Sequence, residues 1–385
     1  MSPEWGGESG SLIDRGSAVD QHLGLAPDPV AGESSRMRAI AAAVLALAAS
    51  AAIASDPGPL FRILRDGKWG FADRSGYVAI TPRFERADRF SDGLAAVQDG
   101  AVQGYVDATG KIALVPEFPP VGVIHRPFSS GLAVVRVGQR YGFMDRTGKL
   151  AIPARYTTAD DFSEGFAMAC DTDGCGYIQP NGRGAVGYGF MGSGPVKGGV
   201  ACISLAMGMG RQRVALRQPD GTAIPGEWEG CGNMSEGLIA VRLGGQWGFI
   251  DARGRGVIQP RFERAGDFSG GLAPATLETG RCGYVDRTGV LAIPARFHAC
   301  HRFSDGLARV DLAEDAFDGE RVAFIDRTGK TVVIGPEASP PFDSAEDFEN
   351  GLAAVGAGGA PHLAGNGTWL GYVDTSGRYV WKPSR

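Results

Sequence analysis

The sequence lacks several features that would point to a particular function. Its formal net charge is only −5, with 38 basic and 43 acidic residues, so it has no strong positive field for a nucleic-acid partner. It contains no serine–histidine–aspartate or cysteine–histidine nucleophile signature, and no glycine-rich phosphate loop between a strand and a helix. Helical periodicity is absent throughout. These absences disfavour nucleic-acid binding and the common hydrolases, and they favour an all-β protein.

Long apolar runs are also scarce, and the one strongly apolar stretch is too short to cross a bilayer. Residues 37–54 place the basic Arg38 before an alanine-rich stretch, 39–49, and end in an Ala-x-Ala pattern at Ala52 and Ala54. This order is typical of a secretory signal peptide that is cleaved after a small residue. It predicts export, with cleavage near Ala54 and a periplasmic or secreted product.

The segments on either side of this stretch differ in composition. Residues 1–36 are polar and rich in glycine and serine, and we interpret them as a disordered or mis-annotated N-terminal extension, with Met37 as the natural start. Residues 55–385 form the predicted mature domain. We expect no membrane span in the mature chain.

Glycine is abundant instead, with 60 residues among 385, which indicates many tight turns. The stretch DGKWGFADRSGYVAITPRFERADRFSDGLAAV, residues 66–97, recurs down the chain. Clear copies start at Arg140, Gln246 and Arg281. Weaker copies follow, including two degenerate ones within 175–242. About nine repeats with a period of about 35 residues indicate a repeat architecture.

Each repeat predicts three short strands. In the first copy these are residues 69–72, 77–81 and 94–97, because apolar side chains alternate in the first two and small apolar residues fill the third. An Asp-x-x-Gly turn joins the first two strands. Pro82 is expected to end the second strand, because proline lacks the N–H of a ladder hydrogen bond. One repeat cannot bury its aromatic face alone, but stacked repeats bury it jointly.

Two architectures fit such a chain. The uneven repeat lengths favour an open, curved β-repeat array, because each repeat then depends only on its neighbours. The alternative is a closed β-propeller-like ring, in which the N-terminal strand would complete the last repeat and join the two ends. We expect the phenylalanines Phe71, Phe143 and Phe249 to be buried at equivalent positions.

The repeat resembles the WG (KWG) repeat family of bacterial proteins. Residues 68–71 spell KWGF and residues 246–249 spell QWGF, and the Asp-x-x-Gly turn, the Ile-x-Pro segment and the Gly-Leu-Ala strand are further family features. The resemblance extends over residues 60–383 and is weakest at 183–199. It implies a repeat scaffold, often exported, with no defined reaction and no cofactor.

We therefore expect an exported, non-enzymatic scaffold that binds a protein or polymer ligand at the bacterial envelope. Ligands often meet repeat arrays where a segment breaks the period. The period-breaking segments are 117–127, 183–199, 311–321 and 356–369. Within the second of them, the candidate ligand-binding residues are Tyr188, Phe190 and Met191.

Two other functions remain as alternatives. A wall-polysaccharide hydrolase would need two carboxylates that converge on one substrate. Most acids recur at the turn position of the repeat and are expected to serve the turn. The off-pattern acids are Asp311, Glu314, Asp315, Asp318 and Glu320. The third possibility is a purely structural spacer.

Six cysteines suit an exported protein that forms disulfides. Matching the repeats pairs Cys170 with Cys175 across one hairpin, as part of the stretch CDTDGC. The same comparison predicts the pairs Cys202–Cys231 and Cys282–Cys300. Two histidines, His298 and His301, flank Cys300 and could be drawn as a metal site, but a disulfide is favoured there and no metal is expected.

Arginines recur just before the connector aromatic of the repeat. They are Arg83, Arg155, Arg261 and Arg296. They could form a basic stripe for an anionic polymer, but we favour a surface role in which each pairs with acids of a neighbouring repeat.

Overall fold

The computed structural model describes residues 58–117, 126–207, 211–312, 321–335, 338, 342, 344–357 and 369–382. These residues belong to one compact unit, Asp56–Arg385. The expected N-terminal extension and signal peptide lie outside the described residues. Apart from one residue of 3-10 helix at Gly335, the regular structure of the described part is β-strand, which confirms the all-β class.

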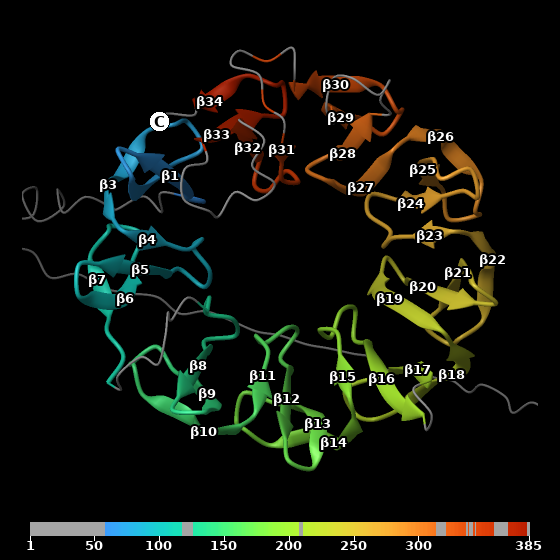
Figure 1. The fold of residues 1–385 in the computed structure, drawn as a ribbon, viewed down its shortest axis with the longest axis horizontal. Helices are drawn as coiled ribbons and strands as arrows, with labels where there is room; N and C mark the ends of the chain where they lie inside the picture. Colours follow the sequence, from blue (N-terminus) through green and yellow to red (C-terminus); the bar gives the residue numbers. More distant parts are fainter. Residues whose placement is uncertain are drawn as a thin grey trace, which may run out of the picture. The chain divides into compact units, whose positions relative to one another are not determined.

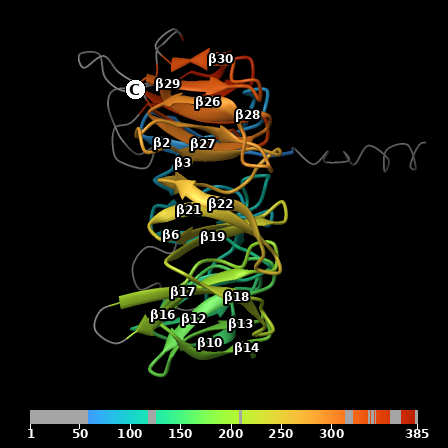
Figure 2. The same cartoon turned by 90° about the vertical axis from the view of Figure 1, so that its right-hand side faces the viewer.

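The strands form nine small antiparallel sheets, which follow one another around a ring (Figure 1). Seen edge-on, the sheets form a single layer around the ring (Figure 2). We call the sheets blades 1 to 9 in chain order. The first three are blade 1 with β1 (Phe61–Arg65), β2 (Lys68–Ala72) and β3 (Val78–Phe84); blade 2 with β4 (Arg86–Ala87), β5 (Ala95–Asp99), β6 (Val102–Val106) and β7 (Ile112–Leu114); and blade 3 with β8 (Ala133–Val137), β9 (Arg140–Met144) and β10 (Leu150–Tyr156).

The remaining six blades have four described strands each. Blades 4 to 6 are β11 (Thr158–Ala159), β12 (Ala167–Asp171), β13 (Gly174–Ile178) and β14 (Gly184–Phe190); β15 (Gly192–Ser193), β16 (Ala201–Met207), β17 (Arg211–Arg217) and β18 (Ala223–Trp228); and β19 (Gly230–Ser235), β20 (Leu238–Leu243), β21 (Gln246–Asp251) and β22 (Gly256–Phe262). Blades 7 to 9 are β23 (Arg264–Ala265), β24 (Ala273–Thr276), β25 (Cys282–Val285) and β26 (Leu291–Phe297); β27 (Ala299–Ser304), β28 (Leu307–Leu312), β29 (Arg321–Ile325) and β30 (Thr331–Ile334); and β31 (Ser344–Ala345), β32 (Leu352–Ala357), β33 (Trp369–Asp374) and β34 (Tyr379–Trp381).

The blade and the sequence repeat are out of phase. The third strand of one repeat, β5, pairs with the first strand of the next repeat, β6, and not with β2 of its own repeat. The connector adds a fourth strand that the sequence did not predict, such as the two-residue β4, and this strand lies at the inner end of the blade (Figure 1). A repeat therefore contributes strands to two neighbouring blades.

The second strand of the repeat is also longer than predicted. Strand β3 continues through Pro82 to Phe84, and the proline is tolerated because β3 is an edge strand with an irregular register. The irregularity brings this backbone close to β2. A Cβ atom on Gly70 would lie 2.5 Å from the carbonyl oxygen of Ile80, so the glycine of the Trp-Gly-Phe triplet leaves room for the bulged edge.

The core lies between successive blades. Phe71, Phe143 and Phe249 are at most 1% exposed, as the sequence predicted. Phe71 belongs to a cluster that combines blade 1 with Ala95 and Val97 of blade 2. A blade therefore buries its aromatic face only when its neighbour is present, which is the packing expected of a repeat protein.

The ring is closed, so the expected open array is wrong and the propeller-like alternative is confirmed. Blades 1 and 9 share a core that includes Ile63, Ala72, Leu352 and Trp381. The contact between blades 9 and 1 also resembles the contact between blades 1 and 2. A Cβ atom on Gly76 would lie 2.6 Å from the Val380 carbonyl oxygen, just as a Cβ atom on the equivalent Gly110 would lie 2.8 Å from Ile80. Blade 9 thus packs against the turn glycine of blade 1 in the same way as blade 1 packs against that of blade 2.

The uneven repeats are compatible with a ring because their extra residues lie between strands. The connection from β28 to β29 runs from Leu312 to Arg321, and that from β32 to β33 runs from Ala357 to Trp369. Sheet packing sets the angle between blades, so these insertions leave it unchanged. The N-terminal strand does not complete the last blade, as the ring alternative had supposed. Strand β1 pairs with β2, and blade 9 contains four strands of its own.

Candidate functional site

Most junctions between blades carry the same polar contact, which we call the serine clasp. A serine near the inner end of one blade donates its hydroxyl hydrogen to the backbone carbonyl of the next blade, as Ser91 does to Phe128 at 2.6 Å. The other clasps are Ser129–Phe162, Ser163–Val196, Ser235–Phe268, Ser269–Phe303 and Ser304–Phe348. Each hydroxyl satisfies a carbonyl that the inner end would otherwise leave unpaired.

An aromatic contact recurs at most junctions, with or without the clasp. The ring of Phe71 in blade 1 lies 4.8 Å from that of Phe90 in blade 2, measured between centroids. Equivalent pairs recur at 4.7–5.0 Å, namely Tyr105–Phe128, Phe143–Phe162, Phe249–Phe268, Tyr284–Phe303 and Phe324–Phe348. Their tilted or edge-on geometry is favourable for aromatic rings.

Two blades have another residue at the serine position. The bridge Ser91↔Leu94 of blade 2 corresponds to Lys197↔Val200 in blade 5 and to Glu349↔Leu352 in blade 9. In blade 5 the clasp is replaced by the disulfide Cys202–Cys231, which joins β16 of blade 5 to β19 of blade 6. In blade 9 the change coincides with a pocket.

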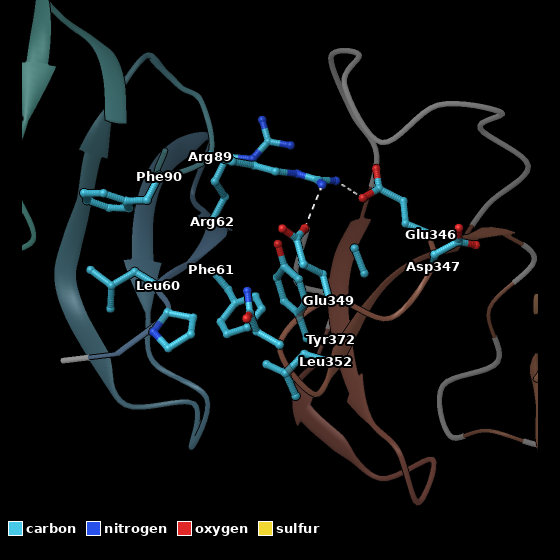
Figure 3. A pocket seen from close by; sticks show the side chains of 13 residues that line it. Leu60, Phe61, Arg62, Arg89, Phe90, Glu346, Asp347, Glu349, Leu352 and Tyr372 are labelled. Carbon is cyan, nitrogen blue, oxygen red and sulfur yellow. Dashed lines mark hydrogen bonds and ion pairs between the residues drawn. The ribbon is translucent and has the colours of Figure 1, made fainter. Parts of the chain in front are cut away.

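This pocket lies at the closing junction, the contact between blade 9 and blade 1, and has a volume of about 200 Å³. Tyr372 occupies the position of Phe71 in its blade, but its aromatic partner is Phe61 of strand β1, at 5.4 Å. Residues from blades 1, 2 and 9 line the pocket (Figure 3). The apolar ones are Pro59, Leu60, Phe61, Phe90, Leu352, Ala354 and Tyr372, and the charged ones are Arg62, Arg89, Glu346, Asp347 and Glu349.

Arg89 reaches across the mouth of this pocket. It follows β4 in blade 2, yet it forms ion pairs with two acids of blade 9, Glu346 and Glu349, the latter at 3.1 Å (Figure 3). These ion pairs span the inner end of blade 1. Because all three side chains are more than a third exposed, the pairs add little stability and can rearrange around a ligand.

Arg62 is the more deeply buried cation. Its Nη1 donates a hydrogen bond of 3.1 Å to the Ala87 carbonyl and lies 4.0 Å from a carboxylate oxygen of Asp88. Its buried Nε has no hydrogen-bond partner among the described residues. Burial lowers the pKa of Arg62, with the nearby Arg89 charge adding to the effect, while Tyr372 opposes it. Burial also raises the pKa of Tyr372 to about 12, so the phenol is neutral at physiological pH.

A second hollow of about 400 Å³ continues from the first toward blade 3. It shares Arg62, Arg89, Phe90 and Glu349 with the closing pocket and adds Pro127 and others. The two guanidinium groups therefore stand at the boundary between an apolar pocket and a more open groove. Such a combination of an apolar wall and a few converging polar groups is typical of a ligand site.

The sequence did not single out these residues. A detectable signal was present, because the serine of the Phe-Ser-x-Gly motif is replaced by Glu349 in FENG. Arg89 and Arg62 were harder to find, since arginine occurs at many surface positions of the repeat. Only the closure of the ring brings residues about 260 positions apart, Arg89 and Glu349, into contact.

The predicted ligand segment 183–199 proves regular in structure. It contains β14 and β15, the outer strand of blade 4 and the inner strand of blade 5. Phe190 is 4% exposed and packs against Tyr177 at 5.5 Å, whereas Met191 is 69% exposed. Tyr188 lies in β14, and its side chain is outside the described part. Phe190 thus has a packing role, and ligand binding at this segment stays a prediction.

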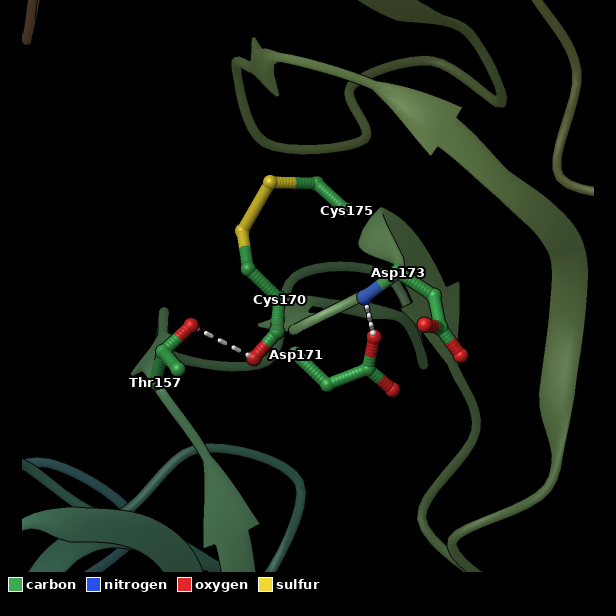
Figure 4. Close-up of a disulfide and its surroundings, with 5 residues drawn as sticks. All are labelled: Thr157, Cys170, Asp171, Asp173 and Cys175. Atoms are coloured by element: carbon green, nitrogen blue, oxygen red, sulfur yellow. Dashed lines mark hydrogen bonds between the residues drawn. A yellow bond between two sulfur atoms is a disulfide. The ribbon is translucent and has the colours of Figure 1, made fainter.

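All three disulfides join the predicted partners. Cys170–Cys175 closes the β12–β13 hairpin, where the Asp173 amide donates to the Asp171 carboxylate at 2.9 Å, as expected of a turn (Figure 4). Cys282–Cys300 connects β25 of blade 7 to β27 of blade 8. Because Cys300 is bonded to Cys282, these sulfurs are not free metal ligands. Within the described ranges, the His, Cys, Asp and Glu side chains form no group suited to a metal.

The recurring acids serve the turns, as predicted. In Asp145 the carboxylate accepts hydrogen bonds from the Thr147 hydroxyl and amide at 2.6 and 2.8 Å. The hydroxyl above all holds the pKa of Asp145 below its usual value. Of the off-pattern acids, Asp311 lies in β28, and the other four, 314–320, lie outside the described residues.

The recurring arginines connect blades, although mostly to a carbonyl and not to an acid. Arg83 lies over the Phe84 ring and donates to the Gly110 carbonyl of blade 2 at 2.8 Å, with an ion pair to Asp99 at 3.4 Å. Arg155, Arg261 and Arg296 repeat the stacking and the bond to a turn glycine. These contacts support the structural role over a basic stripe. In the described part, no helix is long and apolar enough to cross a membrane.

Solved structures resemble this chain in fold. A eukaryotic initiation factor has 12% sequence identity and a TM-score of 0.58, over 83% of this chain and 94% of that chain. Dipeptidyl peptidase 4 of Porphyromonas gingivalis has 9% identity and a TM-score of 0.47, over 86% and 60% of the two chains. Apo AztD of Citrobacter koseri has 12% identity and a TM-score of 0.38, over 85% and 93%. At 12% identity the likeness to the initiation factor concerns the fold alone.

The family of the chain is identified from its sequence repeats. No curated protein matches the chain. Seven segments match the family described as "WG containing repeat": 69–101, 104–141, 141–174, 222–247, 247–278, 283–312 and 323–359. These matches cover most of the ring, and their order follows the blades. The chain therefore belongs to the WG-repeat family and folds as a nine-bladed β-propeller.

Proposed function

We propose that this WG-repeat propeller is an exported, non-enzymatic scaffold that binds a protein or polymer ligand at the bacterial envelope, through the closing pocket. One observation carries the proposal. The closing junction replaces the serine clasp by Glu349 and leaves a pocket of about 200 Å³ that combines aromatic walls with two arginines. A hollow of about 430 Å³ between blades 7 and 8 has no phenylalanine, tyrosine or tryptophan in its lining, so the closing pocket is the better candidate for a ligand.

Export is supported by the sequence of residues 37–54 and by the cysteines. All six cysteines are paired, and two of the three bonds, Cys202–Cys231 and Cys282–Cys300, hold neighbouring blades together. Disulfides of this kind persist in oxidising compartments. Cell fractionation with N-terminal sequencing tests the claim, and we expect a periplasmic or secreted product that starts near Ser55. An intact Met1 on cytoplasmic protein would contradict it.

Binding is tested by capture from envelope extract with a matched pair of variants. Arg89→Glu reverses the charge at the pocket mouth. Arg213→Glu makes the same change in blade 5, where Arg213 is 48% exposed and pairs with Glu227 at 2.7 Å, away from the closing pocket. We expect a component that the wild type and Arg213→Glu retain and Arg89→Glu loses. Equal capture by all three proteins would exclude the closing pocket as the binding site.

A further inference from the structure

We propose that the closing pocket receives the C-terminal residue of a peptide chain, with an apolar side chain in the pocket and the terminal carboxylate between Arg62 and Arg89. This inference rests on the proposed binding function and names its ligand.

The size and lining of the pocket fit one large apolar side chain. Its volume of about 200 Å³ is below the roughly 300–1,000 Å³ of pockets for drug-sized ligands. The walls are Leu60 and Phe61 of the first blade and Leu352 and Tyr372 of the last. Tyr372 is 7% exposed, and its aromatic neighbour Phe61 holds the ring in place. A long polymer cannot enter this pocket, but a chain end can.

The two arginines supply the anion site. Arg62 and Arg89 lie close enough for the charge of Arg89 to lower the pKa of Arg62, so the two cations repel each other. An anion between them relieves that repulsion. The Arg62 guanidinium lies over the Trp69 ring at 5.3 Å and bonds the Ala87 carbonyl through Nη1, while its buried Nε has no hydrogen-bond partner among the described residues. A carboxylate is suited to this place, because its two oxygens match the fork of guanidinium donors.

The acids of blade 9 narrow the choice of ligand. Glu346 and Glu349 hold Arg89 in position, and Asp347 is directed toward Arg309 at 3.7 Å and Arg302 at 3.9 Å. Three carboxylates around one pocket disfavour a ligand with several negative charges. A peptide end carries a single carboxylate, and its neutral amide N–H is a donor for the exposed Glu349. The adjoining hollow of about 400 Å³, which both arginines also line, reaches Pro127 and leaves room for the preceding residues.

The test uses the purified protein and fluorescent peptides in binding titrations. The probes are a hexapeptide that ends in phenylalanine with a free carboxylate, the same peptide with a C-terminal amide, and one that ends in aspartate. We expect the first to bind at least about tenfold more tightly than the other two, because the amide lacks the charge-assisted hydrogen bonds. Equal binding of the acid and the amide would overturn the carboxylate assignment.

Variants and a free acid complete the design. Arg89→Gln is expected to weaken the first peptide about tenfold, and Arg213→Gln, which removes an exposed ion pair to Glu227 in blade 5, to leave it unchanged, with thermal unfolding of both as the check on folding. N-Acetylphenylalanine separates a peptide end from a free organic acid: affinity equal to that of the hexapeptide would overturn the peptide assignment. If envelope capture depends on Arg89 but no peptide binds, the ligand class is wrong and the binding function stands. If capture does not depend on Arg89 and no peptide binds, the binding function of the pocket and the peptide ligand are both wrong.

Discussion

Two junctions show another residue in place of the clasp serine, and they differ in the contact that replaces the clasp. Between blades 5 and 6, where Lys197 stands at the serine position, a covalent bond links Cys202 to Cys231. At the closing junction, where Glu349 stands there, exposed ion pairs to Arg89 bridge the gap and a pocket remains. The first replacement is permanent in an oxidising compartment, whereas the second is reversible.

The comparison shows that a lost contact need not indicate a site. The junction of blades 5 and 6 is irregular in sequence but tightly connected, and the disulfide explains how. The closing junction is regular at its outer part, where Gly76 meets Val380, and irregular only at its inner part. A functional site is inferred where an irregularity leaves space and uncompensated donors, not from the irregularity alone.

The largest expected change in the free energy of unfolding comes from aromatic residues between blades. It should be larger at an ordinary junction than at the closing junction. Phe143→Ala removes a fully buried ring between blades 3 and 4 and is expected to lower the free energy of unfolding by about 3–5 kcal/mol. Tyr372→Ala should cost less, because the ring already borders a pocket. Hydrogen exchange should show lost protection that fades beyond the adjacent blades, and uniform loss around the ring would contradict nearest-neighbour packing.

The disulfide between blades 5 and 6 gives the next effect. The double substitution Cys202→Ala and Cys231→Ala should lower the free energy of unfolding by roughly 3–4 kcal/mol, because the bond closes a loop with a sequence separation of 29. The control is Cys170→Ala with Cys175→Ala, whose separation of 5 predicts about 2 kcal/mol. Denaturant titration measures both. A larger loss in the control would show that loop closure is not the main source of stability.

Acid should destabilise most blades through their turn aspartates; blade 4, with Gln179 and Asn181 in this turn, is the exception. The folded pKa of Asp145 lies below the unfolded value near 3.9, because the Thr147 hydroxyl and backbone amides bind the charged form. Its contribution is therefore present above pH 4 and is lost as the pH falls through the folded pKa. Asp145→Asn should reduce this acid sensitivity and cost under about 1.5 kcal/mol at neutral pH. Unchanged acid unfolding would contradict the prediction.

A smaller effect is expected at the pocket mouth. Arg89→Gln should lower the free energy of unfolding by about 0–1 kcal/mol, because its ion pairs are exposed, and the difference should shrink in high salt. Arg213→Gln, which also removes an exposed ion pair, is the control. A loss of several kcal/mol would show that Arg89 is needed to hold the ring closed, and that the pocket is not separable from the fold.

The smallest effect concerns the segment that the sequence favoured for ligand binding. Met191→Ser should change the free energy of unfolding by less than about 0.5 kcal/mol, because the side chain is 69% exposed. Its effect on envelope capture decides between two sites. Capture that depends on Met191 and not on Arg89 would move the ligand site from the closing pocket to the edge of blade 4.

Local features of the fold were predictable and the assembly was not. Strand alternation, turn aspartates and buried phenylalanines depend on neighbours within one repeat, so Phe71 and Asp73 could be assigned from sequence. The cysteine pairs were predictable because equivalent repeat positions restrict the partners. Ring closure depends on the angle between sheets, which side-chain packing sets and repeat length does not reveal. The closing pocket forms only when the ring closes, so the contact between Arg89 and Glu349 could not be predicted from the sequence.

The phase difference between repeat and blade bears on how such rings change size. Because each repeat supplies strands to two blades, the chain has no boundary at which a unit must be cut. A tandem duplication of about 35 residues, with breakpoints anywhere in the gene segment, would therefore insert a whole blade and preserve every strand pairing around it. Copying errors in the DNA can then lengthen or shorten the ring one blade at a time. Every junction of a closed ring must adapt to the new angle, and the contact between the first and last blades must form without a chain connection, so this contact is where descendants of one ancestor are expected to diverge most.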